Sequence, residues 1–129
     1  FEFLGFTHYW GISRKGRKVI QRKTARKRIV RTLKGMSAWC RENRHVKLTE
    51  QCRKIGAKLK GHYAYFGITG NGASLQNVFD KTKKIWHYWL NRRSRSRSDL
   101  NWERFGEMIE QFMPLPIPRV VHSIYAAKP

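Results

Sequence analysis

Apolar residues recur at helical spacing through most of this chain, and that periodicity constrains the fold more than any other feature. A repeat every three or four residues puts the apolar side chains on one face of a helix, where they can build a shared core. The repeating positions, for three long segments in turn, are Ile29, Leu33, Met36 and Cys40; Cys52, Ile55, Leu59, Tyr63 and Phe66; and Leu75, Val78, Phe79, Thr82, Trp86 and Trp89. The sequence therefore predicts a small helical bundle.

Capping and breaking residues set the expected limits of these helices. Thr24 is a suitable N-cap for the first helix, which should end near Asn43. The second helix should begin near Leu48 or Thr49, and the glycine-rich stretch 67–72 should separate it from a third helix that opens near Ser74. A short fourth helix is expected over residues 102–112, with Phe105, Ile109 and Phe112 on its apolar face.

The two ends of the chain follow different patterns. Residues 1–12 are rich in strand formers, 13–16 read as a turn, and 17–23 read as a return strand, which together predict a β-hairpin. Pro114, Pro116 and Pro118 exclude a continuing helix and predict an extended tail. We therefore expect a mainly α fold in which an N-terminal β-hairpin (1–23) precedes a three-to-four-helix bundle (24–113) and a Pro-rich extended tail (114–129).

The charge balance points to a polyanionic partner. The chain of 129 residues has 28 Lys and Arg against 8 Asp and Glu, a formal net charge of +20, and no acid lies between Glu2 and Glu42. A surface so one-sided repels itself in isolation, so nucleic acid is the expected partner and an anionic membrane is the alternative. The chain has neither an apolar run long enough to span a bilayer nor a secretory signal pattern, and we expect a cytoplasmic protein without membrane association.

Basic residues interleaved with exposed aromatics are the candidate RNA-binding residues. Lysine and arginine neutralise phosphates, and an aromatic ring on a basic face offers a platform on which an unpaired base can stack. The alternatives are an ordinary solvated helix face for the cations and an incidental exposed ring for each tyrosine. The predicted RNA-binding residues are Arg14, Lys15, Arg17, Lys18, Arg22, Lys23, Lys27, Arg31, Lys34, Lys54, Lys58, Tyr65, Lys84, Tyr88, Arg92, Arg93, Arg95 and Arg97.

No catalytic, metal or cofactor site is predicted. Cys40 and Cys52 lie on core-facing positions, so we expect buried, reduced thiols rather than zinc ligands. His62 and His87 have no acidic neighbour in sequence, which favours structural or RNA-contact roles over acid–base chemistry. Catalysis by either histidine is the less favoured alternative.

Six short motifs, in order along the chain, resemble the end of the palm and the thumb (maturase-specific domain X) of group II intron reverse transcriptases. They are Phe3-Leu4-Gly5-Phe6, Arg22-Lys23-Thr24, Gly61-His62-Tyr63 with Tyr65-Phe66-Gly67, Trp89-Leu90-Asn91-Arg92-Arg93-Ser94, Trp102-Glu103-Arg104-Phe105 and Pro114-Leu115-Pro116. The resemblance implies a segment that grips intron RNA to assist RNA splicing and, in the full enzyme, holds the template–primer duplex. It also implies a protein partner, the upstream palm and fingers portion of the parent protein.

This chain departs from the family where catalysis is concerned. The family's catalytic aspartates lie upstream of the segment that the resemblance covers, and Asp80 and Asp99, the only aspartates here, are placed too differently to hold the two metal ions of a polymerase. We therefore expect no polymerase activity from this chain alone, although the parent that the resemblance implies would be an RNA-directed DNA polymerase. A general basic nucleic-acid-binding module, or a decayed remnant without splicing activity, is the alternative.

Overall fold

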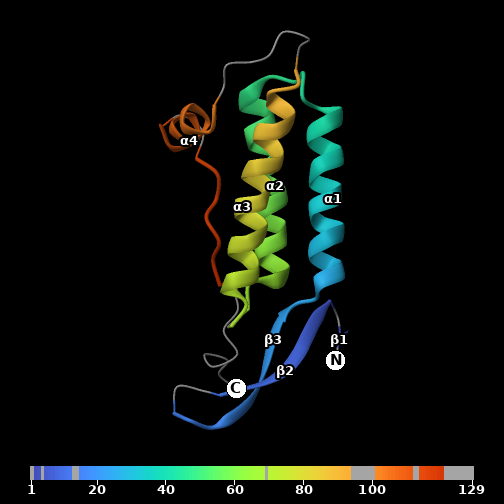
Figure 1. The fold of residues 1–129 in the computed structure, drawn as a ribbon, viewed down its shortest axis with the longest axis vertical. Helices are drawn as coiled ribbons and strands as arrows, with labels where there is room; N and C mark the ends of the chain where they lie inside the picture. Colours follow the sequence, from blue (N-terminus) through green and yellow to red (C-terminus); the bar gives the residue numbers. More distant parts are fainter. Residues whose placement is uncertain are drawn as a thin grey trace.

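The computed structural model describes residues 2–3, 5–12, 15–68, 70–93, 101–111 and 114–120. Three strands come first, β1 (Glu2–Phe3), β2 (Phe6–Ile12) and β3 (Lys18–Thr24). Four helices follow, α1 (Arg26–Glu42), α2 (Leu48–Phe66), α3 (Gly72–Leu90) and α4 (Trp102–Gln111). The expected fold class, a mainly helical protein with an N-terminal antiparallel hairpin, is confirmed (Figure 1).

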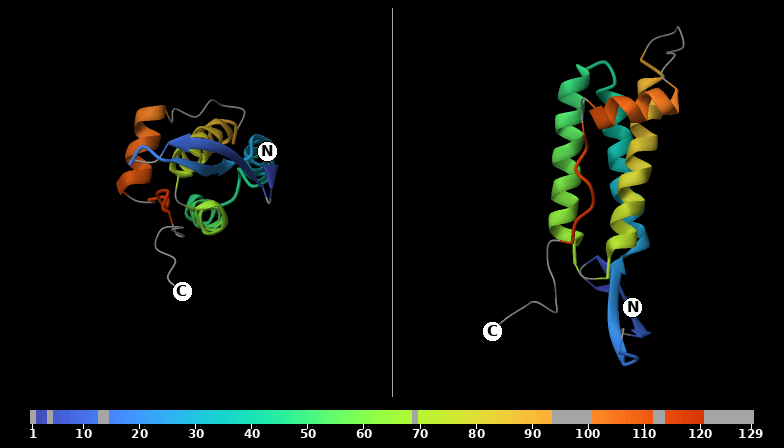
Figure 2. Two further views of the ribbon diagram at one scale, coloured as in Figure 1. Left: turned by 90° about the horizontal axis from the view of Figure 1, so that it is seen from below. Right: turned by 90° about the vertical axis from the view of Figure 1, so that its left-hand side faces the viewer.

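The hairpin projects from one end of the bundle (Figures 1 and 2). β2 and β3 pair antiparallel from Phe6 opposite Thr24 to Ile12 opposite Lys18. The first predicted strand is not continuous, because the chain reverses at Gly5 and β1 pairs back on β2. Gly5 has a φ of 85°, in the left-handed region that glycine adopts most readily, so this residue allows the reversal.

The three long helices run up, down and up beside one another (Figure 1). α3 is the helix that the other two share, since both α1 and α2 pack against it. The buried core joins all four helices and the tail, and its members are Met36, Cys40, Cys52, Ile55, Leu59, Tyr63, Phe66, Leu75, Val78, Phe79, Trp86, Leu90, Phe105, Ile109 and Leu115. The predicted apolar stripes thus supply most of the core.

α4 crosses the bundle near the end opposite the hairpin, and the tail then runs back along the long helices (Figure 2). Residues 114–120 form neither helix nor strand. The Tyr63 hydroxyl donates a hydrogen bond of 2.9 Å to the Pro116 carbonyl, and Leu115 is buried. The described part of the proline-rich segment, residues 114–120, is therefore packed on α2.

One prediction about local structure is wrong, and another holds only in part. Thr24 is the last residue of β3 and not the N-cap of α1, because Ala25 occupies the cap position and makes no side-chain cap hydrogen bond. Trp89 is only partly buried, and its indole N–H donates to Ser37 Oγ over 3.1 Å at the edge of the core. Leu90, the next residue, is the one that enters the core.

Both cysteines lie in the core, as their positions on the predicted apolar stripes indicated. Cys40 and Cys52 are both buried, and burial raises the pKa of the Cys40 thiol to about 12. Among the described helices, none has the length and apolar character needed to cross a membrane.

Candidate nucleic-acid interface

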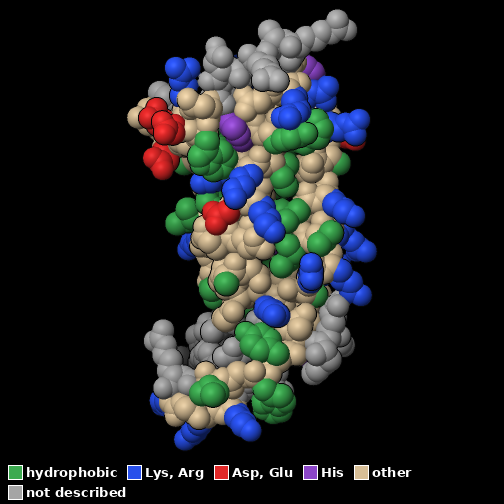
Figure 3. All heavy atoms as spheres, in the orientation of Figure 1, with side chains coloured by type: hydrophobic (Ala, Val, Ile, Leu, Met, Phe, Trp, Pro, Cys, Tyr) green, Lys and Arg blue, Asp and Glu red, His purple; other side chains and the backbone are tan. Residues whose placement is uncertain are grey.

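Charge differs most between α1 and α4. α1 carries Arg26, Lys27, Arg28, Arg31, Lys34 and Arg41 and has no acid until its last residue, Glu42. α4 carries Glu103, Glu107 and Glu110. In Figure 3 the cationic side chains follow the edge formed by α1, and acidic side chains gather over α4 on the opposite side. The molecule therefore presents a strongly cationic α1 edge to a ligand.

The structure describes most of the predicted RNA-binding residues, and nearly all of those side chains are exposed. The exposed ones are Lys15, Arg17, Lys18, Lys23, Lys27, Arg31, Lys34, Lys54, Lys58, Tyr65, Lys84, Tyr88 and Arg92. Arg93 is half-buried. Arg14, Arg95 and Arg97, and the side chain of Arg22, lie outside the described residues.

Two helices bring predicted cations together at one groove. Arg31 of α1 and Lys58 of α2 both line a cavity of about 220 Å³ between these helices. Lys27 and Lys34 are exposed on the same helix as Arg31, one turn before it and one turn after it. The exposed cations of α1 and the lysines of α2 therefore border a common cationic surface. We call it the α1–α2 surface, and it consists of Lys27, Arg31, Lys34, Lys54 and Lys58.

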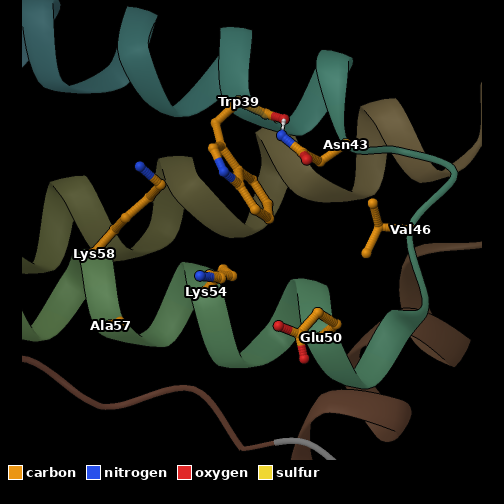
Figure 4. Close-up of a pocket in the computed structure, with 7 residues that line it drawn as sticks. All are labelled: Trp39, Asn43, Val46, Glu50, Lys54, Ala57 and Lys58. Carbon is orange, nitrogen blue, oxygen red and sulfur yellow. Dashed lines mark hydrogen bonds between the residues drawn. The ribbon is translucent and has the colours of Figure 1, made fainter.

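A larger groove of about 570 Å³ continues this surface toward the α1–α2 connection. Figure 4 shows Trp39 pointing from α1 toward α2, with Lys54, Lys58 and Glu50 on the facing helix. Lys58 Nζ lies 5.8 Å from the centroid of the Trp39 ring, a cation–π distance. A flat aromatic ring and two ammonium groups thus share one groove.

One carboxylate, that of Glu50, also lines this groove. Arg53 Nε donates a hydrogen bond of 3.3 Å to Glu50 Oε2, and the two side chains form an ion pair on the helix surface. This hydrogen bond, with the nearby positive charge, lowers the pKa of Glu50, so the carboxylate is ionised at neutral pH. The groove is therefore cationic beside Lys54 and Lys58 and anionic beside Glu50.

Tyr65 is exposed as predicted, but its ring has aromatic neighbours. The ring stacks on Phe6 of β2 with centroids 6.0 Å apart and planes 10° from parallel, and it also meets Phe66 edge-on at 4.5 Å. Tyr65 remains 55% exposed. It therefore links the hairpin to α2 and still presents surface to a ligand.

Tyr88 carries a cation on its ring. The Arg92 guanidinium lies 3.5 Å from the Tyr88 ring centroid and also donates to the Tyr88 carbonyl over 3.0 Å. Arg44 Nε donates to the Arg92 carbonyl over 3.1 Å, which adds a second arginine at this end of the bundle. A base that stacked on the covered face of Tyr88 would have to displace Arg92.

His62 and His87 both pack against aromatic rings. His62 is buried, and desolvation lowers its pKa, so it is neutral at physiological pH. His87 packs edge-on against Trp102 at 5.3 Å. Within the described part of the chain, no group of three or more His, Cys, Asp or Glu side chains is placed to hold a metal ion.

Trp39 and Arg44 lie at this interface but are not among the residues predicted from the sequence. A usable signal existed for Trp39, because Lys27, Arg31, Gly35 and Trp39 follow one another at intervals of a helical turn. Gly35 has no side chain to fill the space beside α1, and it lines the smaller cavity, whereas Trp39 lines the larger groove. Arg44 lies in the connection between α1 and α2, where there is no helical repeat from which to predict the direction of its side chain.

The fold and the α1–α2 surface define a class, a small basic helical domain with a cationic groove. Comparisons with protein-family models, with curated proteins and with solved structures found no match.

Proposed function

We propose that this chain binds structured RNA through the α1–α2 surface. We further propose that it acts as the thumb or maturase segment of a group II intron reverse transcriptase, gripping intron RNA to assist splicing and holding the template–primer duplex in the full enzyme. One observation is the main support for the proposal: Lys27, Arg31 and Lys34 form an exposed row on α1, beside Lys54 and Lys58 of α2. The α1 helix has no acid before its last residue, Glu42.

Electrostatics supports phosphate binding over simple solubility. An ordinary solvated helix face interleaves both signs of charge, which offset each other. On α1 the only acid is Glu42, the last residue of the helix, whereas α4 carries three of the chain's eight acids. Binding a phosphate backbone would relieve the repulsion among these cations and release the counterions condensed on the RNA.

A salt series tests the electrostatic part of the proposal. Affinity for a structured RNA should fall linearly on a log–log plot, and each neutralised phosphate should add about 0.7 to 0.9 to the slope. A flat response would exclude phosphate capture as the mechanism.

A second comparison separates maturase function from a general basic module. The chain should bind a folded group II intron RNA more tightly than an unrelated folded RNA of the same length, and the preference should persist at high salt. Equal affinity for both would favour the general nucleic-acid-binding module instead.

The hairpin supports the proposed protein partner. Trp10 and Ile12 are two residues apart on β2, so their side chains lie on the same face of the hairpin, and each is 72% exposed. We propose that this face docks on the palm and fingers portion of the parent. Trp10→Ser with Ile12→Ser should prevent association with a palm–fingers protein added in trans while RNA affinity remains unchanged. Retained association would contradict the docking proposal.

A further inference from the structure

We infer that the groove between α1 and α2 holds one unpaired nucleotide of the bound RNA, with its base against Trp39 and its phosphate between Lys54 and Lys58. This inference rests on the proposed RNA-binding function and deepens it, because it names a site and a structural class of RNA, a helix interrupted by an unpaired nucleotide.

The size and lining of the groove fit a nucleotide. Its volume of about 570 Å³ is within the range of small-molecule pockets. Trp39 supplies a flat indole, while Val46 and Ala57 supply apolar walls. A single base has a π-face that stacks on such a ring, whereas a paired base within a helix cannot reach it.

The charges in the groove orient the ligand. Glu50, Lys54 and Lys58 follow one another at four-residue intervals on α2, so they form a line along the helix (Figure 4). An anionic phosphate is attracted to the two lysines and repelled by Glu50. The base is therefore directed toward Glu50, whose carboxylate can accept a hydrogen bond from an exocyclic amino group.

The position of the groove connects it to the rest of the surface. Lys58 lines both this groove and the adjoining cavity that contains Arg31. A phosphate backbone that followed the cations of α1 would therefore reach the groove without leaving the positive surface. The cations would bind the helical parts of an RNA, and the groove would bind a nucleotide extruded from them.

The test compares two RNAs that differ by one nucleotide. One is a fully paired duplex, and the other is the same duplex with a single bulged 2-aminopurine, whose fluorescence is quenched by stacking. The chain should bind the bulged RNA about 5- to 150-fold more tightly and quench the probe. Trp39→Ala should remove the preference and the quenching, while affinity for the paired duplex stays unchanged.

Two further variants make the result interpretable. Ala57→Leu fills the groove at an exposed helical position with a good helix former, so it should abolish the preference without unfolding the chain. Trp102→Ala removes a partly exposed indole on α4, outside the groove, and should leave the preference intact.

Equal binding of both RNAs by the unaltered chain would overturn the inference while leaving RNA binding itself supported. A preference that survives in both Trp39→Ala and Ala57→Leu would also overturn it. Failure of the unaltered chain to bind either RNA would contradict the proposed function as well.

Discussion

The side chain of Asn71 joins the end of the hairpin to the turn between α2 and α3, because it both accepts a hydrogen bond from Thr24 and donates one to it. The Thr24 backbone N–H donates to Asn71 Oδ1, and Asn71 Nδ2 donates to Thr24 Oγ1, each over 2.8 Å. Asn71 Nδ2 also donates to the Phe66 carbonyl over 2.7 Å. Both side chains are almost fully buried, so this polar joint is shielded from water and holds the hairpin against the bundle.

Replacing Asn71 with alanine should destabilise the protein by about 2 to 4 kcal/mol. The substitution leaves the buried Thr24 N–H without its Asn71 partner, and an unsatisfied buried group costs about 1 to 3 kcal/mol. It also removes the bonds from Asn71 to Thr24 Oγ1 and to the Phe66 carbonyl, although that carbonyl still accepts from the Ile68 N–H. Urea unfolding followed by circular dichroism measures the loss. Asn43→Ala is the matched control and should cost less, because Asn43 is only half-buried. Equal losses would mean that the joint contributes no special stability.

Two tyrosines on α2 should respond differently to truncation. Tyr63 is 3% exposed and hydrogen-bonded to Pro116, so Tyr63→Ala should cost about 3 to 5 kcal/mol through the cavity it leaves. Tyr65 is largely exposed but stacks on Phe6, so Tyr65→Ala should cost only about 0.5 to 1.5 kcal/mol. Thermal melts give the stability, and RNA titrations show whether Tyr65 contributes to binding. A loss of affinity with Tyr65→Ala that exceeds its loss of stability would support base stacking on this ring.

Charge reversal on α1 should weaken RNA binding without unfolding the chain. Lys27→Glu, Arg31→Glu and Lys34→Glu together alter exposed positions, and the added acids lower the net positive charge. RNA affinity should fall, and the salt slope should decrease by about one for each phosphate that the protein no longer neutralises. The control reverses Lys47, Lys60 and Lys81, which are exposed elsewhere and change the total charge equally. If both triple variants bind RNA equally weakly, net charge rather than the α1–α2 surface governs binding.

His62 should make the fold less stable in mild acid. Desolvation lowers its folded pKa below the ordinary value of 6.5, so the unfolded chain binds the proton more tightly. Stability is therefore unaffected above pH 6.5 and falls as the pH drops below it, by about 1.4 kcal/mol for each unit of pKa difference once the pH is below the folded pKa. His62→Phe removes the titrating group and keeps a ring beside Phe66.

Melting temperatures between pH 8 and pH 5 check this prediction. The difference between His62→Phe and the unaltered chain isolates His62 from the other histidines. The variant should lose less stability on acidification. Parallel curves for the two proteins would show that His62 does not contribute.

Glycines on α2 offer a matched pair for helix stability. A methyl group at Gly61 would meet no atom within 4 Å in the described structure, so Gly61→Ala should stabilise the protein by about 0.5 to 1 kcal/mol. A methyl group at Gly56 would lie 3.4 Å from Pro116 Cδ. Gly56→Ala should therefore stabilise less than Gly61→Ala, or destabilise. Chemical denaturation measures the free energy of unfolding of both variants. A larger gain in this free energy for Gly56→Ala than for Gly61→Ala would show that the tail is not held against α2.

Much of the fold could be predicted because helical periodicity is a local property. The spacing of Ile55, Leu59 and Tyr63 identifies one face of α2 as buried, whatever covers it. The same reasoning predicted exposed cations on the opposite faces, including Lys34 and Lys54. The capping prediction failed at Thr24, because this residue ends β3 and its side chain accepts a hydrogen bond from Asn71, which lies in a distant turn.

Gln51 shows a different limit of sequence reasoning. Its position before Cys52 gave no sign of burial, yet it is fully buried and accepts a hydrogen bond of 3.0 Å from the Trp86 indole. Its amide also donates to the carbonyls of Arg44 and Val46, which fixes the α1–α2 connection. A polar side chain enters the core only where partners from other elements satisfy it, and those partners are known only once the chain has folded.

By itself, the sequence determined the mainly helical class, the N-terminal hairpin and the excess of exposed positive charge, because each depends on residue type and short-range spacing. Only the tertiary structure decided which cations meet. Arg31 and Lys58 line one cavity, and Trp39 and Lys54 line the larger groove. These residues come together because α1 and α2 both pack on α3. A helical repeat specifies which face is buried but not which helix lies against it, so the groove arises from long-range packing.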